Sequence, residues 1–337
     1  MIIIRPMVRK DLAAQLDFPA SSIVGMTNLP RDRYLLEQKI IHTENCFKED
    51  VKKPSKEEYY FVLEDLETEQ VIGTCGILSE NNLSRNYFYR IEKKETHAKY
   101  SLHPRTLKLM RAVPNDREAS EVCSLFLLPD FRHGGYGRLL SLSRFLFMAA
   151  HPPRFEKLVV VELRGYLNQD KTSPFWEAVG RHFCNLSFTE LLEHLERDRS
   201  ILPELLPEFP IYIELLPKEV QEVIGKTHVS TQPAMSMLMQ EGFKLTDEVD
   251  LFDGGPILSA PFDEIRSIKH SKIATVTITS EVITEGPQYV LGNEDIDFRA
   301  CLGCLKMISP DEVLIQEEIA EALMIDPGQK VRYIAAR

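Results

Sequence analysis

A strand, a glycine-rich turn and a helix follow one another directly between residues 123 and 150. The apolar run Cys123–Leu128 stops at Pro129, the segment Arg132–Arg138 holds three glycines, and Leu139–Ala150 has the spacing of a helix. A turn of this kind joins a strand to a helix N-terminus, where the first backbone N–H groups have no partner within the helix. With the helix dipole, these groups make the turn a candidate anion-binding site.

The glycines of this turn are Gly134, Gly135 and Gly137. Because glycine has no Cβ atom, it adopts backbone angles that other residues avoid and lets a ligand approach the main chain closely. The spacing Arg132-x-x-Gly135-x-Gly137 matches neither the P-loop pattern GxxxxGK[ST] nor the dinucleotide-binding pattern GxGxxG. The sequence therefore gives no specific support to a nucleoside triphosphatase or to a dinucleotide-dependent enzyme.

The composition is that of an ordinary soluble globular protein. Its residues are 44% hydrophobic and 27% charged. A chain of 337 residues is long enough for two domains, each with its own core. No apolar run is long enough to span a bilayer, and the start Met1–Arg5 lacks a basic region before its apolar run, so it reads as a strand. We therefore expect a cytoplasmic protein with no membrane partner. The net charge of −11 argues against nucleic-acid binding and fits a cationic small substrate.

Of the six cysteines, only Cys301 and Cys304 have the spacing of a metal or redox pair. No second Cys/His pair follows them. The segment Phe298–Met307 is predicted to be one strand, on which residues three apart point to opposite faces. Both cysteines are therefore expected to be structural, and no metal site is predicted.

The N-terminal half shows a regular order of elements before the glycine turn. Hydrophobic patterns and capping residues predict a strand at 2–6, a helix starting at 9–16, a helix over 32–46, a hairpin of strands 59–63 and 71–78, and a strand at 87–91. After the turn and its helix, the continuous apolar run 157–163 is the expected parallel neighbour of strand 123–128.

A long segment, 164–226, then interrupts this order. Ser173-Pro174 reads as an N-cap with a first-turn proline, and Ser187 with Glu190 has capping-box spacing, so the segment is predicted to be a helical insertion. A further helix over Thr231–Phe243 follows, and Gly242 stands at its C-terminal end.

The motif at 132–137 resembles the pyrophosphate-binding motif R/Q-x-x-G-x-G/A of the GNAT acyl-CoA N-acyltransferases. The segment Thr231–Phe243 resembles the fourth helix of the same fold in its Ala234 and its Gly242-Phe243 ending. The resemblance implies an α+β fold with a mixed central sheet flanked by helices. It also implies that strands 123–128 and 157–163 splay apart at one end, with the acyl-thioester arm of the coenzyme in the gap.

The division expected from these patterns is a GNAT-like domain at 1–255, carrying the helical insertion 164–226, and a small β-rich C-terminal domain at 256–337. The tail is predicted to hold strands at 273–278, 289–290, 298–305 and 331–335 around one helix near 316–324.

Acyl transfer to an amine requires a bound thioester, a deprotonated amine and a neutralised thiolate. Arg132, Gly135 and Gly137 would hold the coenzyme, with the backbone of Leu125 and Leu127 along its arm. The position of the tyrosine that many GNAT enzymes use is occupied by Leu238, so His228, just before the fourth helix, is the candidate proton donor.

The carboxylates Glu121 and Glu162 lie on the two central strands. Glu121 is taken as a candidate catalytic base and Glu162 as a candidate substrate contact. Each could hold a cationic amine or relay its proton through water, and each could instead pair with Arg164 or another basic residue.

Across almost its whole length the chain resembles the arginine N-succinyltransferases, a GNAT branch of arginine catabolism. The resemblance rests on motifs that a general GNAT enzyme lacks as well as on the shared ones: Glu121-x-Cys-x-Leu-Phe-Leu127, Ser143-Arg-Phe145, Ser173-Pro-Phe-Trp176, Glu204-Leu-x-Pro207, Pro210-Ile-Tyr212, Val223-Ile-Gly225, His228-x-x-Thr231-x-Pro-Ala234 and Phe252-Asp-Gly-Gly-Pro256. It implies succinyl transfer from succinyl-CoA to the arginine α-amino group in a ternary complex, with His228 as the proton donor and Leu125 as a succinyl-CoA contact.

The segment 21–33 departs from the family pattern. It retains Gly25, Thr27, Leu29 and Pro30, but Arg33 stands where the family has an acid, and Val229 replaces the usual proline after the histidine. A basic residue facing the substrate would disfavour a guanidinium group.

Three hypotheses follow: an arginine or ornithine N-succinyltransferase, a related acyltransferase with another amine or acyl donor, and an inactive acyl-CoA-binding subunit. Succinyl-CoA is expected as a co-substrate, with no tightly bound cofactor. The chain is expected to form a homo-oligomer or to pair with a related chain.

Overall fold

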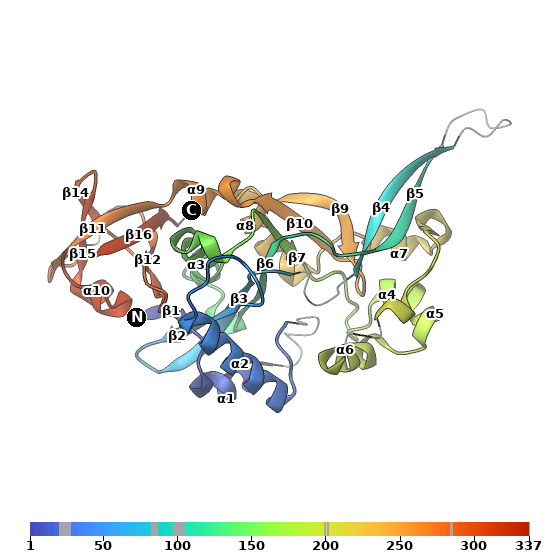
Figure 1. Cartoon of the computed structure of the whole chain (residues 1–337), viewed down its shortest axis with the longest axis horizontal. Coiled ribbons are helices and arrows are strands. Elements are labelled where there is room, and N and C mark those ends of the chain that lie inside the picture. The colour runs from blue at the N-terminus through green and yellow to red at the C-terminus, as the bar shows by residue number, and fades with distance from the viewer. Residues whose placement is uncertain are drawn as a thin grey trace.

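The structure is a computed structural model that describes residues 1–19, 28–81, 87–96, 105–198, 200, 202–283 and 286–336. The described strands form one continuous mixed sheet that runs through the whole molecule (Figure 1). Their bounds are β1 Ile2–Pro6, β2 Glu58–Asp65, β3 Gln70–Leu78, β4 Tyr87–Thr96, β5 Arg105–Pro114, β6 Ser120–Leu127, β7 Leu158–Glu162, β8 Ile211–Tyr212, β9 Lys244–Asp250, β10 Pro256–Pro261, β11 Lys272–Thr279, β12 Tyr289–Asn293, β13 Ala300–Gly303, β14 Lys306–Ser309, β15 Glu312–Gln316 and β16 Lys330–Ala335.

The order of strands across the sheet is β14-β15-β11-β16-β12-β13-β1-β2-β3-β6-β7-β10-β9-β4-β5-β8. The parallel pairs among them are β6 with β7 and β11 with β15, whereas the other neighbours are antiparallel. The predicted mixed sheet is therefore confirmed.

The helices flank this sheet. Their bounds are α1 Leu12–Asp17, α2 Arg33–Lys48, α3 Tyr136–Ala150, α4 Pro174–Ala178, α5 Arg181–Cys184, α6 Phe188–Arg197, α7 Lys218–Val223, α8 Gln232–Gln240, α9 Arg266–His270 and α10 Glu317–Leu323. Of the described helices, none combines the length and the apolar composition needed to cross a bilayer.

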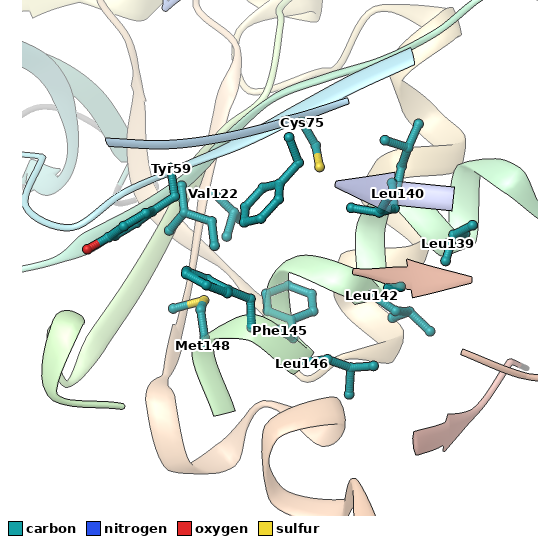
Figure 2. Close-up of a cluster of buried hydrophobic side chains, with 14 of the residues drawn as sticks. Tyr59, Cys75, Val122, Leu139, Leu140, Leu142, Phe145, Leu146 and Met148 are labelled. Atoms are coloured by element: carbon teal, nitrogen blue, oxygen red, sulfur yellow. The ribbon is translucent and has the colours of Figure 1, made fainter. Parts of the chain in front are cut away.

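Helix α3 is the centre of the core. All its residues from Leu139 to Met148 are buried, which is typical of a helix enclosed on every side. Its side chains pack against strands β2, β3 and β6, through residues such as Tyr59, Cys75 and Val122 (Figure 2). The strand, turn and helix of residues 123–150 are thus fixed rigidly with respect to the sheet.

Local sequence signals set the ends of several helices. The Asp32 carboxylate caps α2 by accepting from the amides of Tyr34 and Leu35. Ser187 and Glu190 form the predicted capping box of α6, and Ser173 caps α4 ahead of Pro174. Gly242 follows α8 with φ of +100°. The helical insertion is confirmed, with the addition of the short strand β8, which pairs with β5.

The insertion and the C-terminal strands lie at opposite ends of the molecule (Figure 1). Helices α4 to α7 pack with β4, β5 and β9 around a second core that contains Phe175, Trp176 and Leu191. At the other end, β11, β12, β13, β15, β16 and α10 enclose a third core, and β13 joins the N-terminal sheet by pairing with β1.

Strand pairing corrects the predicted boundary between residues 255 and 256. Strand β10 begins at Pro256 and pairs with β7 and β9, so a boundary there would separate β10 from both of its neighbours. We therefore place the start of the C-terminal part at β11. The sequence signal was misleading because Gly254, Gly255 and Pro256 resemble a linker.

The predicted single strand over 298–307 is wrong. The segment forms two strands, β13 and β14, because β13 pairs with β12 and β1 whereas β14 pairs with β15. Cys301 is buried in β13 and Cys304 lies after it, half-buried, and both are free thiols.

Candidate functional site

A cavity of about 610 Å³ opens where β6 and β7 separate. The two strands pair only at Ser120 with Val159 and at Glu121 with Val160, although β6 continues to Leu127 and β7 to Glu162. The cavity is lined by both strands, by the turn at 132–137, by α3 and α8, and by residues around Asp250 to Asp253. The expected splay of the two strands is thus present, and the cavity lies in it.

A bulge in β6 faces this cavity. Gly76 of β3 pairs with Cys123 and Thr74 with Phe126, so Ser124 and Leu125 together oppose a single β3 residue. Ser124 has φ of +52°, a left-handed angle that is uncommon for a residue with a side chain. A bulge re-aims the backbone and leaves its extra residue out of the ladder. Its position gives the main chain near Leu125 a way to contact a molecule in the cavity.

The glycine turn forms one end of the cavity. Gly134 and Gly135 have φ of +61° and +84°, and Gly135 is the N-cap of α3. Gly137 lies in the first turn of the helix, and all three glycines line the cavity. Arg132 is exposed beside them, and its Nε donates to the Leu127 carbonyl at 3.1 Å. Free amides, the helix dipole and a fixed guanidinium group together favour an anion here.

The two carboxylates lie on different strands that border the cavity. Glu121 of β6 is buried and accepts a hydrogen bond from Asn28 Nδ2 at 3.0 Å. Glu162, at the end of β7, is half-buried and pairs in register with Ile257 of β10. Both residues line the cavity, so the structure brings these two predicted residues to one site.

His228 borders the site through its neighbours and does not itself line the cavity. Its Nδ1 lies 2.9 Å from Arg164 Nη2 and 2.8 Å from Ser230 Oγ, and Arg164 and Ser230 both line the cavity. A guanidinium group can only donate, so Nδ1 accepts and the ring proton is on Nε2. Burial, together with the nearby charge of Arg164, lowers the pKa of His228. The histidine was expected from the sequence to have a pKa near neutrality.

The loop that carries Arg164 is held by a buried carboxylate that sequence reasoning missed. Asp253 accepts from the amides of Gly165 at 2.7 Å and Gly255 at 2.8 Å. Burial, with the nearby Asp250, raises the pKa of Asp253 well above its usual value. A Cβ atom on Gly165 or on Gly255 of the Asp253-Gly-Gly-Pro256 motif would lie within 2.4 Å of a backbone oxygen, and Gly254 of the same motif has φ of +67°, which explains why these positions are glycines.

This loop fixes the relation between Arg164 and His228. Gly165 forms an antiparallel bridge with Thr227, and the His228 amide donates to the Arg164 carbonyl at 2.9 Å. The two side chains therefore start from neighbouring backbone positions, and their hydrogen bond follows from that pairing.

The other predicted residues have clear positions. Leu125, Leu127, Arg132, Gly135 and Gly137 all line the cavity. Leu238 is buried in the core and also reaches the cavity wall.

The departures in the N-terminal segment lie elsewhere. Arg33 is exposed at the first residue of α2 and does not line the cavity, whereas Gly25 and Thr27 lie outside the described residues. The concern that Arg33 faces the substrate therefore has no support from the geometry of this cavity.

Comparison with known proteins identifies the family. The family model described as arginine N-succinyltransferase beta subunit matches residues 2–267, and the model of its C-terminal domain matches residues 272–335. The chain belongs to the arginine N-succinyltransferase family. The resemblance inferred from the sequence motifs is confirmed, and the gap between the two family models falls near the start of β11, where strand pairing also places the boundary.

Individual members of the arginine N-succinyltransferase family match over nearly the full chain. The arginine N-succinyltransferase subunit alpha of Pseudomonas aeruginosa is 36% identical and covers 99% of this chain and 100% of its own length. The arginine N-succinyltransferase of an Enterobacter species is 37% identical and covers 90% of this chain and 88% of its own length.

A solved structure shares the whole fold. The arginine/ornithine succinyltransferase subunit AI from Pseudomonas aeruginosa superimposes with a TM-score of 0.90 at 34% identity. The alignment covers 100% of this chain and 99% of that one. The continuous sheet described above is therefore a property shared with a solved member of the family.

Proposed function

We propose that this protein transfers the succinyl group of succinyl-CoA to the α-amino group of arginine. The observation that carries the proposal is the cavity between β6 and β7, which has an anion-binding turn at one end and two carboxylates on its walls. Membership of the arginine N-succinyltransferase family supplies the reaction, and the names of the relatives supply the acyl group and the acceptor.

The donor would bind along β6. The diphosphate of coenzyme A would accept from the amides at Gly135 and Gly137, with Arg132 beside it. The pantetheine arm would follow Leu127 and Leu125, so that the thioester carbonyl reaches the bulge at Ser124. The co-substrate is consumed in each turnover, and the protein's own part is to hold and orient it.

The acceptor would bind against Glu121 and Glu162. An arginine carries a cationic side chain and an ammonium group, and a cavity bordered by two carboxylates favours both. One carboxylate would take a proton from the ammonium group, directly or through water, and so expose the lone pair of the amine.

We assign the delivery of a proton to the sulfur to His228. The amine attacks the thioester carbon, the C–N bond forms, and the C–S bond breaks with its electrons on the sulfur. The Nε2 proton of His228 moves to the sulfur in concert with the return of the second amine proton to Nε2, so that no free imidazolate forms. The positive charge of Arg164 beside Nδ1 stabilises the partial negative charge that the ring carries during this exchange.

The proposal extends to assembly and to a second acceptor. The names of the family model and of a Pseudomonas aeruginosa relative contain the word subunit, which supports a homo-oligomer or a pairing with a related chain. The solved relative is named an arginine/ornithine succinyltransferase, so ornithine is the alternative acceptor.

Thiol release from succinyl-CoA tests the function directly. Purified protein is incubated with succinyl-CoA and arginine, ornithine or a neutral amino acid, and the acylated product is identified by mass spectrometry. We expect thiol release with arginine and N-succinylarginine as the product. Saturable binding of coenzyme A with no turnover of any amine would instead support an inactive binding subunit, and turnover of a neutral amine alone would indicate a different acyltransferase.

A further inference from the structure

Arg144 is a fully buried cation whose charge the proposed reaction does not yet use. It lies on α3 with 2% of its surface exposed, and it is the only charged residue between Leu139 and Ala150. A buried charge is costly unless a counter-ion or a ligand compensates it.

The partners of Arg144 are all neutral. Its Nε donates to the Ser141 carbonyl at 3.3 Å and its Nη2 to Ser141 Oγ at 3.2 Å, and its guanidinium carbon lies 5.7 Å from the centre of the Phe145 ring. Among the described residues, no carboxylate forms an ion pair with it. A buried cation without a carboxylate partner is suited to bind an anionic ligand, which would compensate its charge.

The titratable groups that interact electrostatically with Arg144 do not supply a negative charge. Cys75 and Cys123 both interact electrostatically with Arg144, and burial raises the pKa of each thiol to about 12. Both thiols are therefore neutral at physiological pH, and the described part of the chain offers the guanidinium group no counter-ion.

Arg144 faces the cavity at the level of the β6 bulge. It lines the cavity together with Leu140 on its own helix and Met237 on α8. Its neighbour Cys123 directly precedes Ser124, where the thioester carbonyl is proposed to bind. Arg144 follows Gly135 by nine positions, about 13 Å along the helix axis, so the diphosphate site and this guanidinium group are separate.

We propose that Arg144 binds the free carboxylate of the dicarboxylic acyl group and thereby makes the enzyme select succinyl-CoA over neutral acyl donors. The acyl chain is the part of the donor that continues beyond the thioester, and its far end is an anion. A guanidinium fork matches a carboxylate with two parallel hydrogen bonds. The chemistry of transfer rests on the proposed function, whereas the selectivity of donor binding does not.

The test compares succinyl-CoA with butyryl-CoA, whose four-carbon acyl group lacks the carboxylate. Dissociation constants are measured by calorimetry, and turnover is measured with arginine. The wild-type protein is expected to prefer succinyl-CoA. In Arg144→Met the affinity for succinyl-CoA is expected to fall by about 100-fold, as for loss of one partner of a buried charge pair. The affinity for butyryl-CoA is expected to change by less than about threefold.

A matched control is Arg154→Met. Arg154 is also a buried arginine, but it donates to Tyr59 Oη at 2.7 Å and to the Glu49 carbonyl at 2.7 Å, and it does not line the cavity. Its loss is expected to lower the melting temperature and to leave the ratio of the two donor affinities unchanged. Arg144→Lys keeps the charge without the fork and is expected to retain part of the preference.

Three results would overturn the proposal. The first is equal affinity of the wild-type protein for succinyl-CoA and butyryl-CoA. The second is an equal loss of affinity for both acyl-CoA donors in Arg144→Met. The third is a raised KM for arginine in Arg144→Met with an unchanged ratio of the two donor affinities, which would show that Arg144 binds the carboxylate of the arginine substrate. If no amine is acylated but the donor preference is present and depends on Arg144, the proposed reaction fails and the donor site stands.

Discussion

At Gly135 the main chain enters α3 with a left-handed angle, and together with Gly134 this residue sets the geometry of the proposed anion site. A Cβ atom there would lie 3.2 Å from Leu302 Cδ1, a side chain of the C-terminal part. We predict that Gly135→Ala lowers the free energy of unfolding by about 1–2 kcal/mol, the cost of a left-handed angle for an L-residue, and weakens coenzyme A binding. Chemical denaturation and calorimetry measure the two effects.

Gly137→Ala is the control for this prediction. Gly137 has an ordinary helical angle, and its Cβ would meet only Leu127 Cδ2, at 3.9 Å. Because alanine is the better helix residue, this variant is expected to keep or raise the free energy of unfolding. Equal destabilisation by the two variants would show that the left-handed angle is not what the turn requires.

A pH profile tests the role of His228. Its pKa is lowered from 6.5, so the neutral ring predominates at pH 7 and is lost as the pH falls through the lowered pKa. If the neutral ring acts, kcat/KM declines only below pH 6.5, and His228→Ala removes most of the activity. Arg164→Met removes one cause of the shift, so the acid limb should move to higher pH. Activity that rises as the pH falls through this range would show that the imidazolium acts instead.

Most of the predicted residues border the cavity because strand and helix periodicity determines which backbone they lie on. Leu125, Arg132, Gly135 and Glu162 all line the predicted gap. Arg144 was not predicted as a site residue because it lies inside an apolar helix, where it was noted only as part of the family motif Ser143-Arg-Phe145. Its signal was the isolation of one charge among buried residues, whereas the absence of a carboxylate partner among the described residues is visible only in three dimensions.

At the scale of elements, the bulge in β6 interrupts the pairing with β3 between Cys123 and Phe126, where β6 borders the cavity. Ser124 holds a left-handed angle there, which a β-branched residue adopts poorly. We predict that Ser124→Val lowers kcat with arginine by at least about tenfold and destabilises the protein by about 1–2 kcal/mol. Steady-state kinetics and denaturation measure both.

Ser124→Gly distinguishes backbone geometry from the hydroxyl group. Glycine adopts the same angle without strain, so this variant is expected to retain activity. Comparable losses in the two variants would assign the effect to the serine side chain and would remove the bulge from the mechanism.

Elements with a uniform apolar pattern were predictable from the sequence, whereas strands of the extended sheet that lack such a pattern were not. Strand β6, helix α3 and strand β7 have uniform apolar patterns, and they occur within a few residues of their predicted ends. Strand β5 is rich in basic residues, and β10 begins and ends with proline. Both are strands because partners in the sheet supply their hydrogen bonds, which local sequence does not reveal.

At the scale of the whole molecule, the sheet is continuous from one end to the other. The pairing of β1 with both β2 and β13 joins the C-terminal strands to the strands that border the cavity. We predict a single cooperative thermal transition, with the calorimetric enthalpy equal to the van't Hoff enthalpy. Two separate transitions would show that the C-terminal strands form an independent unit and that β1–β13 pairing contributes little.

Coenzyme A is expected to stabilise this unit as a whole. A ligand that binds only the folded state raises stability by about 2.7 kcal/mol at a concentration of 100 times its dissociation constant. Gly135 lies next to Leu302, so the melting temperature of the entire chain should rise with coenzyme concentration. An increase limited to part of a biphasic transition would contradict this coupling.

A crystal structure with bound coenzyme A tests the central claim most directly. We predict that the diphosphate contacts the amides at Gly135 and Gly137, that the arm follows β6 past Leu127, and that the sulfur lies in the gap between β6 and β7 near His228. A diphosphate bound elsewhere, or a His228 ring turned away from the sulfur, would contradict the account.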